Sequence, residues 1–497
     1  MKTYLIIMMA LMPFAVSIGQ ETFELAIKTS TDEMATDIIQ LDNRNYFIVG
    51  TRQAIAETAD YKGMVWVANA YGILVDSIEI IKPDTMVFLT GVQKYGNDYI
   101  VSGKLSYYEH SDRRNFPVFY VVDSNLNLLN EYRIHLDSNY LSVSSMDFVV
   151  DGDKLYISGD AKNRNTTEYY FDIFICKYDL QTHVLQSNFL ELTGDQSSTG
   201  YLKTSNYHII FTHGGWGYPP GYSSGYYALF DSTLNWVVTD SLPDDIRSDN
   251  SAINLTDSTY LLSGRQSVFI EPPSVDEERS VLYEMAFPNE PIKSFEYHMG
   301  TDTLSFPANS SIDTTCTGEI YFSGTANVIP YEAPFQHDPS WVFLSKLDRD
   351  LNPIWTKLYG GDMYYEVCLV KATRDGGAIF ACKTYDYLTQ DHELDILIIK
   401  VNEDGLIVGT GEELPNISVQ DAIVYPNPGN EYFNIQSGPQ INGAVFELFD
   451  LSGNLVLTTT LDERLENISS IKLSSGTYPY QITFQNKIVA SGKWVKE

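Results

Sequence analysis

Apolar residues along this chain come in short runs that end in a small residue and recur at a regular interval. The runs are Tyr46–Gly50, Tyr99–Gly103, Leu155–Gly159, Ile209–Thr212, Tyr260–Gly264, Ile320–Gly324 and Ala378–Ala381. Their last residues lie 52 to 60 positions apart. Short apolar runs bounded by turn residues indicate β-strands, and the regular spacing indicates an internal repeat.

Each repeat contains four strand signals in a fixed order. In the second repeat they cover Met86–Val92, Tyr99–Gly103, Pro117–Val122 and Leu128–His135. Such a meander buries little by itself, so neighbouring repeats must stack to close a core. Four-stranded units of about 50–60 residues are typical of propeller blades. We therefore predict an all-β protein with a seven-bladed β-propeller over residues 20–412. An open β-solenoid is the alternative, and the lack of a sustained 3.6-residue periodicity excludes helical repeats.

Closure of the ring has two candidate strands. Phe23–Lys28 resembles a fourth strand placed before the first repeat, while Leu406–Gly411 offers a fourth strand to the last one. Pairing an N-terminal strand into the last blade joins the two ends and removes exposed sheet edges. We expect Phe23–Lys28 to close the ring.

The N-terminus is predicted to be a signal peptide over residues 1–19. Lys2 is the only early charge, and an apolar run over Tyr4–Val16 leads to small residues before Gln20. No later stretch reaches 18 uninterrupted apolar residues, so we expect no transmembrane segment in the mature chain.

Charge and cysteine content narrow the class of protein. The net charge of −33 argues against nucleic acid as a partner, because that affinity comes from neutralising phosphates. It favours a solvated, self-repelling surface over an acidic face that collects cations. Four cysteines are too few for a disulfide scaffold. Cys368 and Cys382 flank the turn Asp375–Gly377, where either a cross-strand disulfide or two buried thiols would fit.

The connections within a repeat differ strongly in predicted length. First-to-second and third-to-fourth strands are joined by tight turns, whereas second-to-third connections are long. The long ones cover residues 51–62, 104–115, 160–170, 213–225, 265–279, 325–340 and 383–394. In an up-and-down meander they all emerge on one face, and we expect function on this long-loop face.

Aromatic residues in these connections are the candidate ligand-binding residues. They are Trp216, Tyr218, Tyr222, Tyr107, Tyr108, Tyr385 and Tyr387. Such rings combine a flat apolar surface with a polar edge, which suits a glycan or a protein ligand. The alternative is that they pack each loop against its own blade.

Candidates for metal binding or catalysis are weak. His337, Asp338 and His392 come from neighbouring connections, but no His-Glu-x-x-His motif or calcium loop accompanies them. We interpret them as ordinary polar residues and predict no metal or cofactor. The chain has no Gly-x-Ser-x-Gly elbow and no phosphate-binding glycine loop. The acid pairs Asp244-Asp245 and Glu277-Glu278 are interpreted as solvated rather than catalytic.

After a short polar linker over 413–421, the pattern changes to about 70 residues of alternating strands, which predicts a small antiparallel β-sandwich over 422–497. Four motifs stand in it. They are Tyr425-Pro426-Asn427-Pro428, Phe446–Gly453 with Asp450 and Gly453, Leu473–Tyr478 with Gly476 and Tyr478, and Lys493–Lys496.

These motifs resemble the C-terminal sorting domain of the type IX (Por) secretion system of certain Gram-negative bacteria. Pro479 departs from the family, which usually shows an uninterrupted strand there. The resemblance implies export by the N-terminal signal, recognition by the type IX machinery and passage across the outer membrane. It also implies that the domain is then removed and that the protein is released or attached to surface lipopolysaccharide.

Together these observations predict a secreted or cell-surface binding or adhesion protein that uses the long-loop face of a propeller. A polysaccharide-acting hydrolase or lyase with scattered carboxylates is one alternative. A protein–protein scaffold of a surface complex is another.

Overall fold

The fold is all-β: the computed structural model contains strands and no α-helix among the residues that it describes. The described residues are 21–29, 31–53, 61–109, 112–136, 139–163, 171–191, 196–214, 225–243, 246, 251–270, 275–299, 303–330, 332–389, 393–407, 422–425, 428–437, 443–450, 454–461, 465–484 and 487–496. No helix within these ranges is long and apolar enough to span a membrane.

Consecutive strands pair in antiparallel meanders of four, each of which forms one blade of a propeller. Blade 1 contains β2 (Asp32–Gln40), β3 (Tyr46–Gln53), β4 (Tyr61–Ala68) and β5 (Leu74–Ile80). Blade 2 contains β6 (Met86–Tyr95), β7 (Asp98–Glu109), β8 (Asp112–Val122) and β9 (Leu128–Arg133). Blade 3 contains β10 (Tyr140–Asp151), β11 (Lys154–Asn163), β12 (Phe171–Asp179) and β13 (Leu185–Leu190). Blade 4 contains β14 (Gln196–Lys203), β15 (Tyr207–Gly214), β16 (Gly225–Asp231) and β17 (Trp236–Ser241). Blade 5 contains β18 (Ala252–Asn254), β19 (Thr259–Ile270), β20 (Val275–Ala286) and β21 (Glu290–Tyr297). Blade 6 contains β22 (Ser305–Thr314), β23 (Ile320–Ala326), β24 (Trp341–Leu347) and β25 (Pro353–Gly360).

Blade 7 takes its strands from both ends of the propeller sequence. Its strands are β26 (Tyr364–Ala372), β27 (Ala378–Tyr385), β28 (Asp395–Val401) and β1 (Phe23–Ile27). β1 pairs antiparallel with β28, from Phe23 opposite Lys400 to Ile27 opposite Ile396. The expectation that Phe23–Lys28 closes the ring is thereby confirmed. Leu406 and Ile407 are not in a strand, and residues 408–411 lie outside the described ranges.

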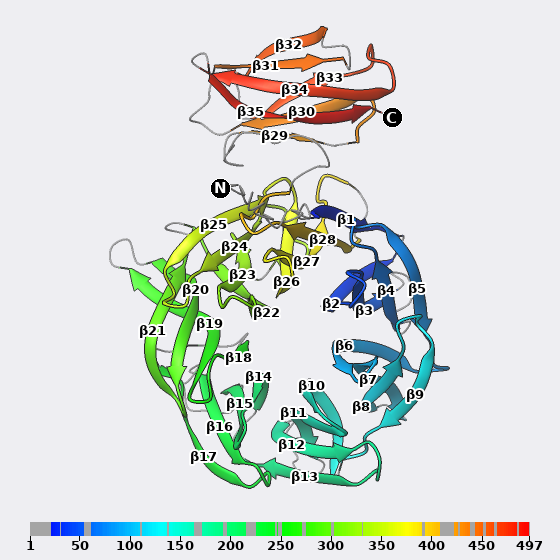
Figure 1. The fold of residues 1–497 in the computed structure, drawn as a ribbon, viewed down its shortest axis with the longest axis vertical. Coiled ribbons are helices and arrows are strands. Elements are labelled where there is room, and N and C mark those ends of the chain that lie inside the picture. Colours follow the sequence, from blue (N-terminus) through cyan, green and yellow to red (C-terminus); the bar gives the residue numbers. More distant parts are fainter. Residues whose placement is uncertain are drawn as a thin grey trace, which may run out of the picture.

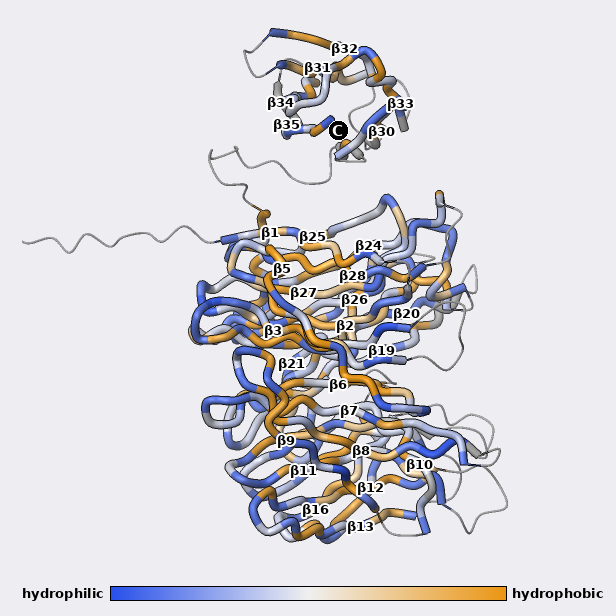
Figure 2. The backbone as a smooth tube through the Cα atoms, turned by 90° about the vertical axis from the view of Figure 1, so that its right-hand side faces the viewer, coloured by the Kyte–Doolittle hydropathy of each residue, from blue (hydrophilic) through white to orange (hydrophobic). Residues whose placement is uncertain are grey.

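The blades are arranged radially. The first strand of each blade lies nearest the centre of the ring and the fourth lies on its perimeter (Figure 1). Hydrophobic positions run along the strands, while the turns at the ends of the blades are mostly hydrophilic (Figure 2). The second strand is buried on both faces, which explains its uninterrupted apolar run.

β3 shows how one strand serves two interfaces. Phe47 and Val49 belong to the core shared with blade 2, where the ring of Phe47 stacks on Tyr99 at 5.2 Å. Ile48 points the other way and packs with residues of blade 7 such as Leu369. Because successive side chains of a strand alternate between its faces, the run fills the contacts to both neighbours.

The small residue at the end of the repeated run has a steric cause. A β-bulge in the first strand of the blade brings a carbonyl close to the second strand. A Cβ added at Gly50 would lie 2.1 Å from the Met34 oxygen, and one at Gly103 would lie 2.6 Å from the Phe88 oxygen. Larger residues are therefore excluded at these two positions.

Turns between third and fourth strands repeat a second pattern. Asp348 accepts hydrogen bonds from the backbone amides of Asp350 (2.8 Å) and Asn352 (2.9 Å). Leu351, at φ +63°, is left-handed and nearly fully buried. Leu126 and Leu234 repeat this conformation and burial after Asp123 and Asp231. Each turn therefore places an apolar side chain in the core between blades.

The prediction of a long loop is wrong for two of the seven connections, where the structure has extended strands. Residues 104–109 and 112–115 belong to β7 and β8, which stay paired as far as Glu109 opposite Asp112. Residues 265–270 and 275–279 belong to β19 and β20, paired as far as Ile270 opposite Val275. The physical reason is cross-strand pairing: the charged and aromatic residues that suggest a loop here lie in extended hairpins, where some are exposed and others, such as Glu277, are buried.

The C-terminal part forms two small sheets. One contains β29 (Ala422–Tyr425), β30 (Tyr432–Ser437) and β33 (Leu465–Ser469). The other contains β31 (Ala444–Phe449), β32 (Leu455–Leu461), β34 (Gly476–Phe484) and β35 (Lys487–Lys496). Phe433, Phe446 and Trp494 are fully buried in the core that these strands share. This arrangement is a small antiparallel sandwich.

All four cysteines are free thiols. In the register of β26 and β27, Cys382 lies opposite Val367, and Cys368 falls at a bulge. The two cysteines are therefore not a cross-strand pair, and of the two alternatives the structure has thiols.

Candidate functional site

A pocket opens on the long-loop side of blade 2, against the link from blade 1. Its volume is about 300 Å³, and we call it the blade-2 pocket. It is lined by Lys82, Thr85, Leu105, Tyr107, Phe116, Arg133 and His135. Lys82 and Thr85 come from the link between β5 and β6, and the other residues come from β7, β8, the last residue of β9 and, for His135, the segment that follows β9.

Strand periodicity positions the aromatic side of the pocket. Leu105 and Tyr107 are two residues apart on β7, so they share a face of the sheet, and Phe116 on β8 lies directly opposite Leu105. The rings of Tyr107 and Phe116 meet edge to face at 5.8 Å. The ring of His135 lies 5.2 Å from that of Phe116. The three rings form a continuous aromatic wall.

The charged side of the pocket is built on Glu131. Lys82 and Arg133 both donate to its carboxylate, Arg133 through Nε at 2.7 Å. Partial burial opposes ionisation of this carboxyl, yet the hydrogen bonds from Lys82 and Arg133 hold the pKa of Glu131 below its ordinary value. At neutral pH these three side chains carry two positive charges and one negative charge.

Two further cations lie on the opposite face of the same extended hairpin, because Lys104 and Arg113 alternate with the pocket residues along β7 and β8. Arg113 donates from Nε to Ser106 Oγ at 2.7 Å and lies over the ring of Phe88 at 5.7 Å. Lys104 also lies over Phe88 and donates to the carbonyl of Ser144 at 2.8 Å. Burial, reinforced by the nearby Arg113, lowers the pKa of Lys104. This end of blade 2 is therefore locally cationic in a chain of net charge −33.

The structure separates the aromatic candidates. Tyr107 lines the blade-2 pocket, whereas Tyr108 is 61% exposed. Tyr385 is buried and packs edge to face on Phe335 at 5.1 Å, so it belongs to the packing of its own connection. The ring of Tyr387, which is partly buried, lies 6.3 Å from that of His337. Trp216, Tyr218 and Tyr222 lie outside the described residues.

The histidine candidates come from connections that do meet. The ring of His337 lies 6.0 Å from that of Tyr385, so the sixth and seventh connections are in contact. His337 and Asp338 are exposed, and His392 lies outside the described residues. Among the residues that the structure describes, no group of three or more His, Cys, Asp or Glu is placed to hold a metal ion.

The interpretation of Glu277 as a solvated acid is wrong. It is 1% exposed on β20, 3.0 Å from Arg279 Nε and 3.1 Å from His298 Nδ1. Glu278 pairs with Arg265 at 3.2 Å. The extended hairpin explains the difference, because it buries a position that a loop would expose. Asp244 and Asp245 lie outside the described part of the chain.

Motif residues of the C-terminal sandwich hold its turns and edges. Asp450 accepts the backbone amide of Asn454 at 2.9 Å, and Tyr478 donates to the carbonyl of Ser474 at 2.7 Å. Lys496 is buried and donates to the carbonyl of Ser470 at 2.5 Å. Gly476 begins β34 with φ +157°, Tyr425 ends β29, and Pro428 is exposed. Pro426, Asn427 and Gly453 lie outside the described residues.

Most of the blade-2 pocket could not be predicted from sequence. Tyr107 was a candidate, but Lys82, Phe116, Arg133 and His135 were not. They are spread over 54 positions and share no motif. The one sequence signal is the presence of Arg113-Arg114 in an otherwise acidic chain.

Comparison with known proteins identifies the C-terminal part. Residues 423–497 match the family model described as the secretion system C-terminal sorting domain. No curated protein matches the chain.

Solved structures similar to the chain include several with low sequence identity. The β-propeller domain of the trilobed protease from Pyrococcus furiosus has 12% identity and a TM-score of 0.41, over 73% of this chain and 98% of that one. The acylaminoacyl peptidase from Pyrococcus horikoshii has 12% identity and a TM-score of 0.41, over 83% and 58%. The sialidase from Trypanosoma rangeli has 9% identity and a TM-score of 0.37, over 86% of each chain. Likenesses at this level carry no argument about activity.

The sorting-domain match and the strand topology together give the conclusion. The chain is a secreted or cell-surface-attached protein in which a β-propeller precedes a type IX secretion system C-terminal sorting domain at residues 423–497.

Proposed function

We propose that the propeller is a binding module that captures a ligand outside the cell through its long-loop face, with the blade-2 pocket as the principal site. The observation that carries this proposal is the combination, in one pocket of about 300 Å³, of an aromatic wall and two cationic side chains. Small-molecule sites have volumes from about 300 Å³ upward and combine apolar walls with a few convergent polar groups.

The charge arrangement favours binding over hydrolysis at this pocket. Glycoside hydrolysis needs two carboxyl groups, one of them with a raised pKa to act as the acid. The described lining contains no carboxyl group, and Glu131 behind it has a lowered pKa because Lys82 and Arg133 bind it. A hydrolase or lyase would have to use other residues of the face. Turnover of a polysaccharide by the purified protein would favour that alternative, and a stoichiometric partner in a pull-down would favour a scaffold.

The experiment compares two neighbouring tyrosines. Tyr107 lines the pocket and Tyr108, the next residue, is mostly exposed, so Tyr108→Ala is a matched control for Tyr107→Ala. We expect Tyr107→Ala to reduce binding of the secreted protein to cells and to a glycan array at least tenfold, while Tyr108→Ala keeps it. Equal binding by the wild type and Tyr107→Ala, with both folded, contradicts the proposal for this pocket.

Trp216, Tyr218 and Tyr222, which lie outside the described residues, stay a second candidate from the sequence, because they belong to the connection between the second and third strands of blade 4. A Trp216→Ala/Tyr222→Ala variant belongs in the same assay. If only that variant lost binding, the long-loop face would be confirmed as the binding face, but the site would belong to blade 4 instead of blade 2.

A further inference from the structure

We infer that the ligand of the blade-2 pocket is an acidic sugar: a single sugar ring that carries a carboxylate or a sulfate group. This inference rests on the proposed function, because it specifies the ligand of the same pocket. It is argued from the charge, the rings and the size of the pocket.

The carboxylate of Glu131 is shared by two cations. Two cationic side chains face one carboxylate, so the group keeps one positive charge to be neutralised by a ligand. Lys82 has three N–H donors and Arg133 has five, and one from each is used on Glu131. The side chain of Arg133 is 49% exposed, so its planar fork is accessible from solvent. Guanidinium groups bind carboxylate and sulfate-like oxyanions through paired hydrogen bonds.

The surroundings make this local charge selective. The chain carries a net charge of −33, so most of its surface repels anions. Arg114 lies directly opposite Tyr107 on the hairpin and adds a cation to the same face, where it pairs with Glu109 at 2.9 Å. An anion that approaches this face is therefore favoured at the end of blade 2.

The rings argue for a sugar as the carrier of the anionic group. Tyr107, Phe116 and His135 present a wall of ring faces and edges. The C–H face of a pyranose packs on such a wall, and the phenol hydroxyl of Tyr107 provides a polar edge for its hydroxyl groups. Thr85 adds a second hydroxyl to the lining. Hydroxyl donors and acceptors beside aromatic carbon match a sugar better than a purely apolar acid.

The size limits how much of a glycan enters. A volume of about 300 Å³ is at the lower end of small-molecule sites, so one ring and its substituent fill it. The rest of an acidic glycan would lie over the long-loop face. The pocket therefore recognises one acidic residue of a glycan rather than the density of charge along a polyanion.

The test is calorimetric titration of the purified full-length chain with four probes. They are a glucuronic-acid disaccharide, a sulfated disaccharide, the corresponding neutral disaccharide and a short glutamate peptide. The variants are Arg133→Gln, Arg133→Lys and, as a matched control on blade 7, Arg374→Gln, which changes an arginine that is 54% exposed and likewise paired with a carboxylate. Melting temperatures verify that each variant is folded.

We expect an acidic disaccharide to bind at least tenfold more tightly than the neutral one. Arg133→Gln should remove this preference, Arg133→Lys should keep part of it, and Arg374→Gln should keep all of it. The two acidic disaccharides distinguish a carboxylate from a sulfate as the recognised group. Equal affinity for acidic and neutral sugars, an unchanged preference in Arg133→Gln, tighter binding of the glutamate peptide, or no binding of any sugar would each overturn the inference.

These outcomes separate the inference from the proposed function. If Tyr107→Ala abolishes cell binding while no acidic sugar is preferred, the pocket binds a ligand of another class. If Tyr107→Ala leaves cell binding unchanged, the proposed function itself fails.

Discussion

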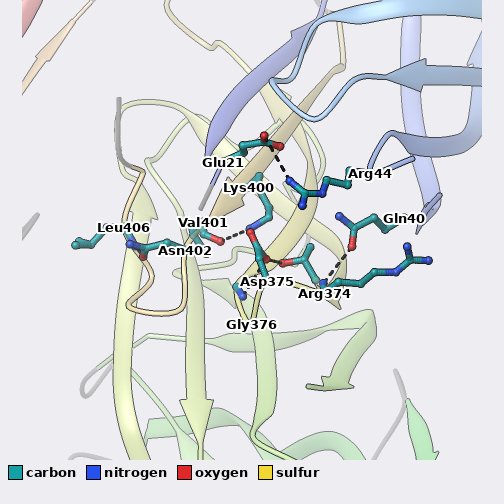
Figure 3. Close-up of polar contacts among 12 residues, drawn as sticks. Glu21, Gln40, Arg44, Arg374, Asp375, Gly376, Lys400, Val401, Asn402 and Leu406 are labelled. Atoms are coloured by element: carbon teal, nitrogen blue, oxygen red, sulfur yellow. Dashed lines mark hydrogen bonds and ion pairs between the residues drawn. The ribbon is translucent and has the colours of Figure 1, made fainter. Parts of the chain in front are cut away.

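The ammonium group of Lys400 lies 3.0 Å from the carboxylate of Asp375, at the strand that joins the two ends of the propeller (Figure 3). Lys400 is on β28 directly opposite Phe23 of β1, and its side chain is 1% exposed. Burial lowers the pKa of Lys400, and Asp375 only partly offsets this effect. Although Asp375 is itself partly buried, the charge of Lys400 lowers the pKa of its carboxyl. Asp375 is therefore the partner that offsets the burial of the Lys400 amine.

Removing the carboxylate should destabilise the ring. In Asp375→Ala the ammonium of Lys400 keeps its bond to the Val401 carbonyl (2.8 Å) but loses its counter-ion, and breaking a buried pair costs about 3–5 kcal/mol. The free energy of unfolding, from urea denaturation of the purified protein, measures the change. The double variant Asp375→Ala/Lys400→Met should recover most of the loss, because no buried charge remains unpaired.

The control for this pair is Asp42 of blade 1, which binds Lys94 of blade 2 and Arg374 of blade 7 at 2.8 Å each but is 71% exposed. Asp42→Ala should leave the denaturation midpoint nearly unchanged, because exposed ion pairs contribute little. A loss below about 1 kcal/mol in Asp375→Ala would contradict the role given to the buried pair.

Features of this fold that leave a local pattern in the sequence could be predicted, whereas features that depend on contacts between distant residues could not. Tyr46–Gly50 and its repeats were recognisable because burial on both faces and the close approach at Gly50 leave a local pattern. The hairpin over 104–115 was not, because its strand pairing depends on a partner strand and its exposed faces carry charges. The blade-2 pocket depends on packing of the link from blade 1 against blade 2. This packing places Lys82 and Arg133 on the same carboxylate, that of Glu131. No short motif records that contact.

A buried histidine should make the propeller less stable in acid. His208 on β15 is 2% exposed, its Nδ1 lies 2.7 Å from the hydroxyl of Tyr201, and burial lowers its pKa to about 4. The unfolded chain protonates this histidine near pH 6.5, so between pH 6.5 and 4 it binds more protons than the folded state. The contribution of His208 is therefore complete above pH 6.5 and declines as the pH falls to about 4, by about 3 kcal/mol in total.

The variant His208→Gln isolates this effect, because glutamine does not titrate and the carboxylates are common to both proteins. The unfolding free energy of the wild type minus that of the variant should fall by about 3 kcal/mol from pH 7 to pH 4. Urea denaturation at several pH values measures it. A difference that stays constant over this range shows that His208 is not buried in its neutral form.

The thiols should differ sharply in reactivity. Cys316 is exposed, whereas Cys176 and Cys382 are buried; burial raises the pKa of Cys368 to about 11 and also raises those of the two buried thiols. The thiolate is the reactive form, so at pH 8 one thiol should react quickly with a chromogenic disulfide reagent and all four should react after unfolding. Cys316→Ser should lose the fast phase and Cys176→Ser should keep it. Fewer than four reactive thiols in the unfolded, unreduced protein would reveal a disulfide.

Delivery outside the cell should depend on residues 422–497 and on the packing of their sandwich. Trp494 is fully buried, with its ring 4.7 Å from that of Phe433, and truncating such a residue costs about 3–5 kcal/mol. Deletion of 422–497 should leave the protein in the periplasm, and Trp494→Ala should reduce the exported fraction. The propeller should fold in both variants, because β1 closes it and its core clusters contain no residue of the sandwich.

The matched control is Ile471→Ala, which removes a side chain that is 68% exposed in the same domain and should leave export unchanged. Immunoblots of periplasm, cell surface and culture medium give the exported fraction, and the urea midpoint of the periplasmic protein verifies the propeller. Two results would separate the explanations. Normal export of the deletion variant would contradict the role of the domain, whereas normal export of Trp494→Ala alone would show that the machinery recognises the segment without requiring the folded core. The deletion removes both the segment that the machinery recognises and its folded core, whereas Trp494→Ala disrupts the core alone. Comparing the two variants therefore also shows whether recognition or packing limits export.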